Sequence, residues 1–187
     1  MRIWCEDFRD NVYTDAMMRD MERVPGGFML GRSLIDHFPN DATMEIRSKR
    51  KPADFFWAGS FPVVSLRLKK LLDEFGVQAE YLRVKLVRRD DSLIPGDWFC
   101  FNVIEVADCF DRSQSKFKAE QDYAGDIEHL VINESACRGS PLVLAKKTFP
   151  GLWIVRDDVA DAIKAAGCDG VLFKRPEDWR DPVNPVT

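Results

Sequence analysis

The chain has 187 residues, of which 45% are hydrophobic and 31% charged, and its formal net charge at neutral pH is −4. This composition is typical of a globular protein and excludes a disordered, collagen-like or coiled-coil chain. No apolar run approaches the roughly 18 residues that a membrane span requires. The start, MRIWCEDFRD, has early acidic residues and no apolar core of a secretory signal. We therefore predict a cytoplasmic protein without membrane contacts.

The first fifty residues give few clear signals. We predict a helix at residues 14–23, ended before a Pro-Gly-Gly turn, and short strands at 44–47 and 55–57. We expect residues 1–50 to form a peripheral N-terminal subdomain, packed on a core domain of residues 51–187. The basic cluster at 47–51 is interpreted as a solvated linker. Direct binding of nucleic acid is not expected, because the chain as a whole is acidic.

Two later segments share one order of elements: a helix, a glycine and a strand. In the first, Ser65 is placed to cap a helix with an apolar stripe, Gly76 ends it, and an alternating strand follows. In the second, two aspartates at 157–158 favour a helix start, Gly167 ends the helix, and a short strand begins at Val171.

Further strands are predicted at 98–106, 127–133, 141–145 and 152–155. The first of these would form a hairpin with the preceding strand, and the last two would be joined by the turn at Pro150. Together these elements predict an α+β fold with a mixed or mostly antiparallel sheet, two helix-glycine-strand units and the N-terminal subdomain.

Recognisable catalytic motifs are missing from the sequence, which contains no nucleophile elbow, phosphate loop or dinucleotide-binding glycine pattern. The five cysteines are dispersed and the two histidines, His37 and His129, have no ligand-like spacing. Adjacent acidic residues are interpreted as turns and helix starts. We predict no catalytic residue, no metal site and no cofactor.

Acidic residues concentrate in the middle of the chain. Residues 97–134 contain nine acidic and three basic residues, a net charge of −6. Most of the excess lies in the polar connection 108–126, for which no secondary structure is predicted. A connection of this length is usually functional or disordered, and aromatic residues interrupt it. If it is a binding loop, its contact residues are Asp108, Asp111, Phe117, Asp122, Tyr123 and Asp126; the alternative is a solvated loop without a binding role.

Four pieces of sequence occur in an order that resembles a known family. They are PVVS at a helix start, NVIEVADCFD at the end of a core strand, PGLWIV in a hairpin arm and AAGCDGVLF near the end. Over residues 54–179 the chain resembles immunity-protein family eleven of bacterial polymorphic toxin systems. The first fifty residues contribute little to the resemblance, which suggests that they are specific to one lineage.

The resemblance implies a non-enzymatic cytoplasmic protein that binds and neutralises a cognate toxin encoded nearby. It supplies no catalytic residues. An acidic surface would suit a toxin that attacks nucleic acids, because such proteins are commonly basic. The alternative function is a small-ligand-binding protein or an enzyme, with a cleft between the N-terminal part and the sheet. Trp57 and Trp98 are the candidates to line that cleft, although plain core packing is the favoured role for both.

Overall fold

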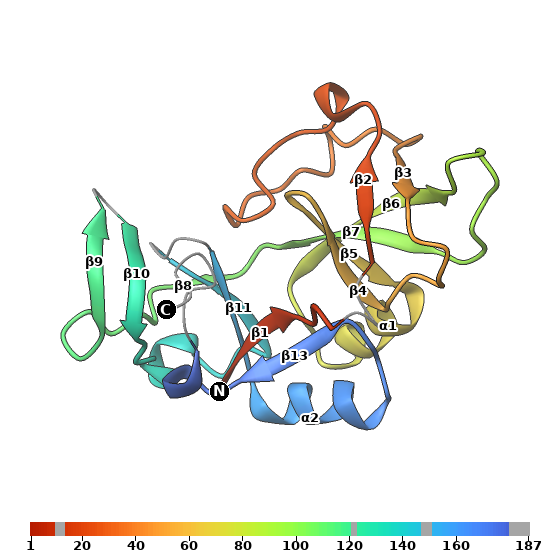
Figure 1. Ribbon diagram of the computed structural model, residues 1–187. Coiled ribbons are helices and arrows are strands. Elements are labelled where there is room, and N and C mark those ends of the chain that lie inside the picture. The colour runs from red at the N-terminus through yellow and green to blue at the C-terminus, as the bar shows by residue number, and fades with distance from the viewer. Residues whose placement is uncertain (10–13, 121–122, 147–150, 180–187) are drawn as a thin grey trace.

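The computed structural model describes residues 1–9, 14–120, 123–146 and 151–179, with the backbone alone at 118–120 and 123–126. Within these ranges the chain forms two α-helices and thirteen strands, arranged in three sheets (Figure 1). Three 3-10 helices complete the elements: η1 (Met21–Arg23), η2 (Glu134–Cys137) and η3 (Pro176–Asp178). The predicted α+β class is confirmed.

The larger sheet has six strands in the order β2-β3-β6-β7-β5-β4. Strands β3 and β6 run parallel, and the other neighbours run antiparallel. The predicted hairpin is confirmed, because β6 and β7 pair from Ala79–Val103 to Val84–Trp98. The bounds are β2 (Ala16–Met18), β3 (Thr43–Ile46), β4 (Phe55–Ala58), β5 (Phe61–Ser65), β6 (Ala79–Val87) and β7 (Trp98–Val103).

The predicted helix at residues 14–23 is wrong. Its central residues form β2, which pairs antiparallel with β3 and places Met18 opposite Met44. Both methionines are buried in one apolar cluster, so pairing with a distant strand overrides the local helical pattern. Helix geometry appears only in the single turn of η1.

The second sheet has five strands in the order β13-β1-β12-β11-β8. The predicted hairpin of β11 and β12 is confirmed, and β8 joins β11 in parallel. The bounds are β1 (Arg2–Glu6), β8 (Val106–Ala107), β11 (Leu142–Ala145), β12 (Leu152–Val155) and β13 (Val171–Lys174).

Strand β1 was not predicted, and it lies inside the second sheet between β12 and β13. The expectation that all of residues 1–50 pack peripherally is therefore corrected for this strand. Strands β2 and β3 extend the six-stranded sheet from its other end. The division into domains at residue 50 stays a prediction.

Both helix-glycine-strand units are present as predicted. Helix α1 (Leu66–Glu74) begins at Ser65, whose hydroxyl accepts a hydrogen bond from the backbone N–H of Leu68 at 3.2 Å. Helix α2 (Asp157–Ala165) leads into β13. Gly76 and Gly167 follow the helices with φ angles of 70° and 66°, the left-handed conformation that glycine adopts freely.

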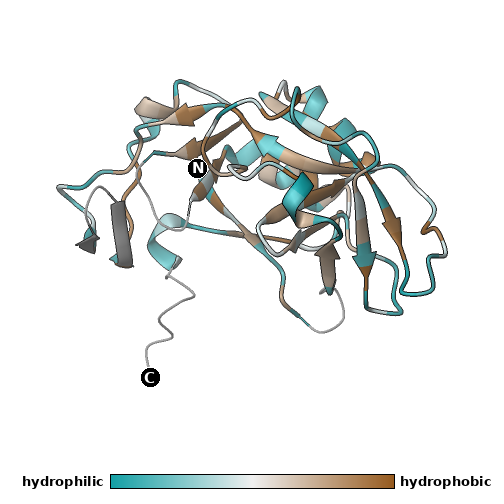
Figure 2. Cartoon of the chain, turned by 90° about the horizontal axis from the view of Figure 1, so that it is seen from above, coloured by the Kyte–Doolittle hydropathy of each residue, from teal (hydrophilic) through white to brown (hydrophobic). Residues whose placement is uncertain are grey.

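The main core lies where the two sheets and the two helices meet. It combines Leu68 and Leu72 of α1, Val159 and Ile163 of α2 and inward-facing aromatic residues of both sheets. Figure 2, coloured by hydropathy, shows hydrophobic residues concentrated on the strands and hydrophilic residues along the loops. The aromatic residues of this core are Trp4, Phe55, Phe101 and Trp153.

A set of hydrogen bonds, here called the clasp, joins the two helix-glycine-strand units. Its residues come from PVVS, from AAGCDGVLF and from the stretch DFFW that precedes β5. The backbone N–H of Asp54 donates to the Asp169 carboxylate at 2.7 Å, and the N–H of Asp169 donates to Asp54 at 3.2 Å. Asp54 also accepts a hydrogen bond from the Ser65 hydroxyl at 2.6 Å. Gly170 lies so close to β4 that an added Cβ would be 1.9 Å from the carbonyl oxygen of Phe55. These sequence pieces therefore have a structural role.

Candidate functional site: a projecting hairpin and two hollows

The predicted unstructured connection 108–126 is wrong, because much of it forms a β-hairpin. Strands β9 (Lys116–Glu120) and β10 (Tyr123–His129) pair antiparallel, with an irregular register between Gly125 and His129. Figure 1 shows this hairpin at one end of the molecule, apart from the two larger sheets. An alternating polar sequence such as KFKAE is compatible with a solvated two-stranded hairpin, which explains why no apolar strand pattern was visible.

The base of the hairpin is attached to the core. Phe110 pairs with Ile132, and the N–H of Asn133 donates to the carbonyl of Cys109 at 2.8 Å. Phe117 is partly buried and packs edge-to-face on Phe110, with ring centroids 5.1 Å apart. The hairpin is thus anchored by aromatic contacts on one side, while its strands extend beyond the core.

Asp111 shapes the turn that leads into β9. Its carboxylate accepts hydrogen bonds from the backbone N–H groups of Ser113 and Gln114 and from both of their side chains. The Ser113 and Gln114 side chains, followed by these backbone N–H groups, hold the pKa of Asp111 below its usual value. Asp111 therefore has a structural task in addition to any role in binding.

The structure places the other predicted contact residues as follows. Asp108 is exposed immediately after β8. Tyr123 and Asp126 belong to β10, but the structure describes only their backbone. Asp122 lies outside the described residues. Asp111 and Phe117 both lie at the hairpin base, through different partners. The contact role of the whole set stays a prediction.

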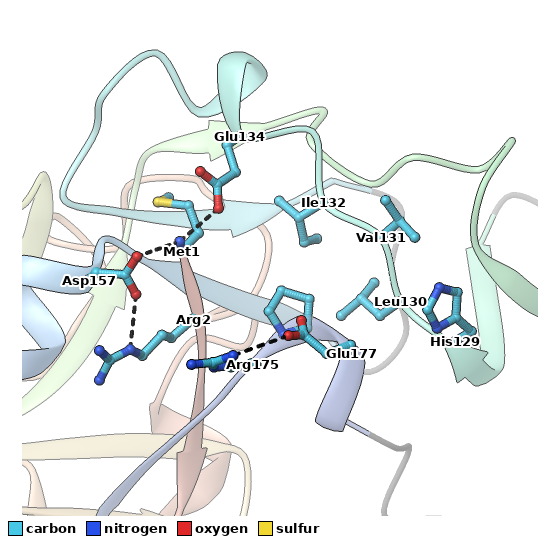
Figure 3. Close-up of a pocket in the computed structure, with 11 residues that line it drawn as sticks. Met1, Arg2, His129, Leu130, Val131, Ile132, Glu134, Asp157, Arg175 and Glu177 are labelled. Atoms are coloured by element: carbon cyan, nitrogen blue, oxygen red, sulfur yellow. Dashed lines mark hydrogen bonds and ion pairs between the residues drawn. The ribbon is translucent and has the colours of Figure 1, made fainter.

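A polar hollow of about 470 Å³ opens at the hairpin base (Figure 3). His129 and Leu130 line it from the end of β10, Arg2 from β1, and Arg175 and Glu177 from the segment around η3. On the far side, Arg2 donates to Asp157 at 2.9 Å. Figure 3 shows His129 at one side beside Leu130, with the ion pairs of Asp157 to Met1 and Arg2 at the opposite side and the Arg175–Glu177 pair between them. No pair of catalytic groups is assembled here among the labelled residues.

A second hollow of about 690 Å³ is a groove where β1 separates from β12. These strands pair only at Arg2–Val155 and Ile3–Ile154, whereas β1 stays paired with β13 as far as Glu6–Val171. The groove has mostly apolar walls, and its size is within the usual range for ligand sites. Its lining side chains include Trp4, Glu6, Phe8, Trp57, Leu172, Lys174 and Trp179.

Of the two tryptophans predicted to line a cleft, Trp57 lines this groove and Trp98 does not. Trp57 stacks on Trp153 with ring centroids 5.5 Å apart and an interplanar angle of 28°. Trp98 is 5% exposed and packs against Phe56 in a separate apolar cluster. The groove lies where β1 diverges from β12 within one sheet. The ligand-binding alternative stays a hypothesis.

Glu6 is the residue of the groove that sequence reasoning missed. Its side chain is 8% exposed, and its Oε1 accepts a hydrogen bond from the backbone N–H of Trp57 at 3.0 Å. Burial raises its pKa to about 7, against the smaller lowering effect of that hydrogen bond. No sequence signal marked Glu6, because the partners of β1 are distant in the chain. Once β1 is known to be a strand, its alternation places Glu6 on the same face as the buried Trp4.

The neighbouring thiol of Cys5 is a poor nucleophile, because burial raises its pKa to about 11. No group of three or more His, Cys, Asp or Glu side chains suited to a metal ion is found among the residues with described positions. In the same part of the chain, no helix has the length and apolar character to cross a membrane.

The comparison with protein families gives one match, to the immunity protein family Imm11, over residues 9–178. The chain belongs to the Imm11 immunity protein family. The match includes most of the first fifty residues, so the expectation that they are specific to one lineage is corrected. No curated protein matches the chain. The clasp and the hairpin lie within the region matched by Imm11, as do Trp57, Leu172 and Lys174 of the groove. Trp4, Glu6, Phe8 and Trp179 of the groove lie just outside it.

Proposed function

We propose that this Imm11 protein acts in the bacterial cytoplasm by binding and neutralising a cognate toxin of a polymorphic toxin system, without catalysing a reaction. The observation that carries the proposal is the family match over residues 9–178. The hairpin β9–β10 is the proposed first contact, because it projects from the core and includes the acidic part of the sequence. An acidic surface accelerates encounter with a basic partner.

The test compares wild type with a triple variant, Asp108→Asn, Asp122→Asn and Asp126→Asn. Asp111 is left intact, since it forms the turn before β9. Binding to the toxin encoded beside the gene is followed by association kinetics at low and moderate salt. The triple variant is expected to associate about tenfold more slowly at low salt and to lose most of the salt dependence.

Two controls separate the parts of this proposal. The single variant Asp111→Asn keeps a side-chain oxygen for the turn and removes one charge, so a smaller effect is expected. If wild type neither binds the toxin nor protects cells that produce it, immunity through this toxin is contradicted. If the triple variant binds as fast as wild type at low salt, the hairpin is not the acidic contact surface, although immunity stands.

The ligand-binding or enzymatic alternative is favoured by one observation, the buried Glu6 in the apolar groove. Among its neighbours in the groove, Cys5 is held in the thiol form and Asp7 is paired with Arg9. His129 lines the other hollow. A screen of metabolites for turnover that disappears in Glu6→Gln would support this alternative over a purely binding role.

A further inference from the structure

The groove between β1 and β12 combines apolar walls with one buried carboxylate. Within the described part of the chain, Glu6 accepts a hydrogen bond from Trp57, and no basic side chain is close enough to shift its pKa. Arg9 also lines the groove, but its guanidinium binds the carboxylate of Asp7. A desolvated carboxylate without a cation is costly, and an incoming positive charge would compensate it.

The walls suit a long side chain with a charged end. Trp57 offers an aromatic surface, and Leu172 and Phe8 are 36% and 65% exposed at the groove. Lysine and arginine pack their aliphatic stems on apolar and aromatic surface while the charged end finds a partner. An anionic occupant would instead place its charge beside Glu6.

We propose that this groove receives a lysine or arginine side chain of the toxin, with its stem on Trp57 and its cationic end on Glu6. The inference rests on the proposed function and adds the class of residue that is recognised and the place where it binds. Contact with the occupant's cation favours the carboxylate form of Glu6, so molecules in which Glu6 is protonated release that proton to solvent on binding. The groove would then act together with the hairpin, which holds a separate part of the partner.

Lys174 provides a test of the sign of the occupant's charge, because it is exposed and lines the same groove. Glu6→Gln keeps the acceptor for the Trp57 N–H and removes the negative charge. For a cationic occupant, Glu6→Gln weakens toxin binding about tenfold or more and Lys174→Gln strengthens it. Lys70→Gln, an exposed change on α1, is the matched control for loss of a lysine.

The opposite pattern, with Lys174→Gln weakening and Glu6→Gln strengthening the complex, identifies an anionic occupant and overturns the inference. The inference is also overturned if Glu6→Gln and Lys174→Gln both bind the toxin as wild type does while the triple variant of the hairpin acids associates more slowly. That result leaves the proposed function in place. Failure of wild type to bind the toxin instead counts against the proposed function.

A toxin-independent arm tests the groove directly. Hexylammonium and hexanoate are titrated into the full chain, and the backbone amide resonance of Trp57 is followed by NMR. Hexylammonium is expected to shift this resonance in wild type and not in Glu6→Gln, with hexanoate inactive in both. A response to hexanoate alone, or to neither probe in a chain with a folded spectrum, overturns the proposal.

Discussion

The hairpin and the groove differ in how the chain builds them. The hairpin uses two strands that are adjacent in sequence and attaches them through a small base around Phe110 and Phe117. The groove is assembled from β1, β4, β12 and β13, which come from both ends of the chain. A local unit can open without disturbing the rest, whereas an opening of the groove requires the core to open. In the proposed complex with a toxin, we expect the hairpin charges to set the rate of encounter and the groove to set the lifetime of the complex.

The largest expected effect is a loss of stability when Gly170, next to the groove strands, is changed. Gly170 accepts a hydrogen bond from the N–H of Asp7 at 3.0 Å and lies against the backbone of Phe55. Its φ angle of 82° disfavours any side chain, and a Cβ would clash with the Phe55 carbonyl. Gly170→Ala is expected to lower the free energy of unfolding by about 3 kcal/mol or more, measured by chemical denaturation.

Gly59 provides the matched control, because it has a similar φ angle of 65° and nothing within 4 Å of an added Cβ. Gly59→Ala is expected to cost only about 1 kcal/mol. Equal losses in the two variants would show that backbone conformation, and not the close approach to β4, determines the effect.

The next largest effect is expected for Glu6→Gln. Its effect on the free energy of unfolding should depend on pH, which distinguishes Glu6 from the acidic residues of the hairpin. Below about pH 4.5, Glu6 is protonated in the folded and the unfolded chain and has no effect on stability. Between about pH 4.5 and pH 7, Glu6 is ionised mainly in the unfolded chain, so the free energy of unfolding falls as pH rises. Above about pH 7 Glu6 is ionised in both states, and this loss of stability stays constant. Glu6→Gln is therefore expected to raise the free energy of unfolding by about 1–3 kcal/mol at pH 8.

Denaturation of both proteins at pH 8 and at pH 4 checks this expectation, since the difference should vanish at the lower pH. A stability difference that is equal at the two pH values would mean that Glu6 is not titrating in the folded chain as the groove geometry indicates.

The smallest effect on global stability is expected from Phe117→Ala. This change removes the ring contact with Phe110 at the hairpin base. Backbone hydrogen exchange in β9 and β10 is expected to become about tenfold faster, which corresponds to about 1–1.5 kcal/mol of local stability. Exchange in β6 and β7 should not change.

Phe8→Ala is the matched control, because it also removes a phenylalanine ring but at the exposed edge of the groove. Hydrogen exchange in β9 and β10 should be the same in this variant as in wild type. Faster exchange in β6 and β7 of the Phe117→Ala protein would contradict the view that the hairpin is a local unit.

Elements with complete local signals could be predicted from the sequence. Helix α1 has its cap at Ser65, its apolar stripe and Gly76, so its position follows from neighbouring residues. The hairpin of β6 and β7 likewise needs only two adjacent segments with a turn between them. Both predictions are confirmed for that reason.

Elements whose partners are distant in sequence could not be predicted. The stretch RIWCE is a strand because residues near 154 and 172 pair with it, and nothing within the stretch indicates this. The helix expected at 14–23 failed because Met18 pairs with Met44. The groove depends on where β1 leaves β12, which is a property of three-dimensional pairing, so Glu6 could not be recognised as a site residue.

The central position of β1 has a consequence for biosynthesis. Strand β1 has β12 and β13 as its neighbours, and both follow it much later in the sequence, so they are synthesised well after it. The five-stranded sheet therefore closes only after residue 174 has emerged from the ribosome, whereas strands β4 to β7 of the other sheet have their partners much earlier. A nascent or C-terminally shortened chain would leave β1 unpaired, which makes such fragments targets for chaperones and proteases.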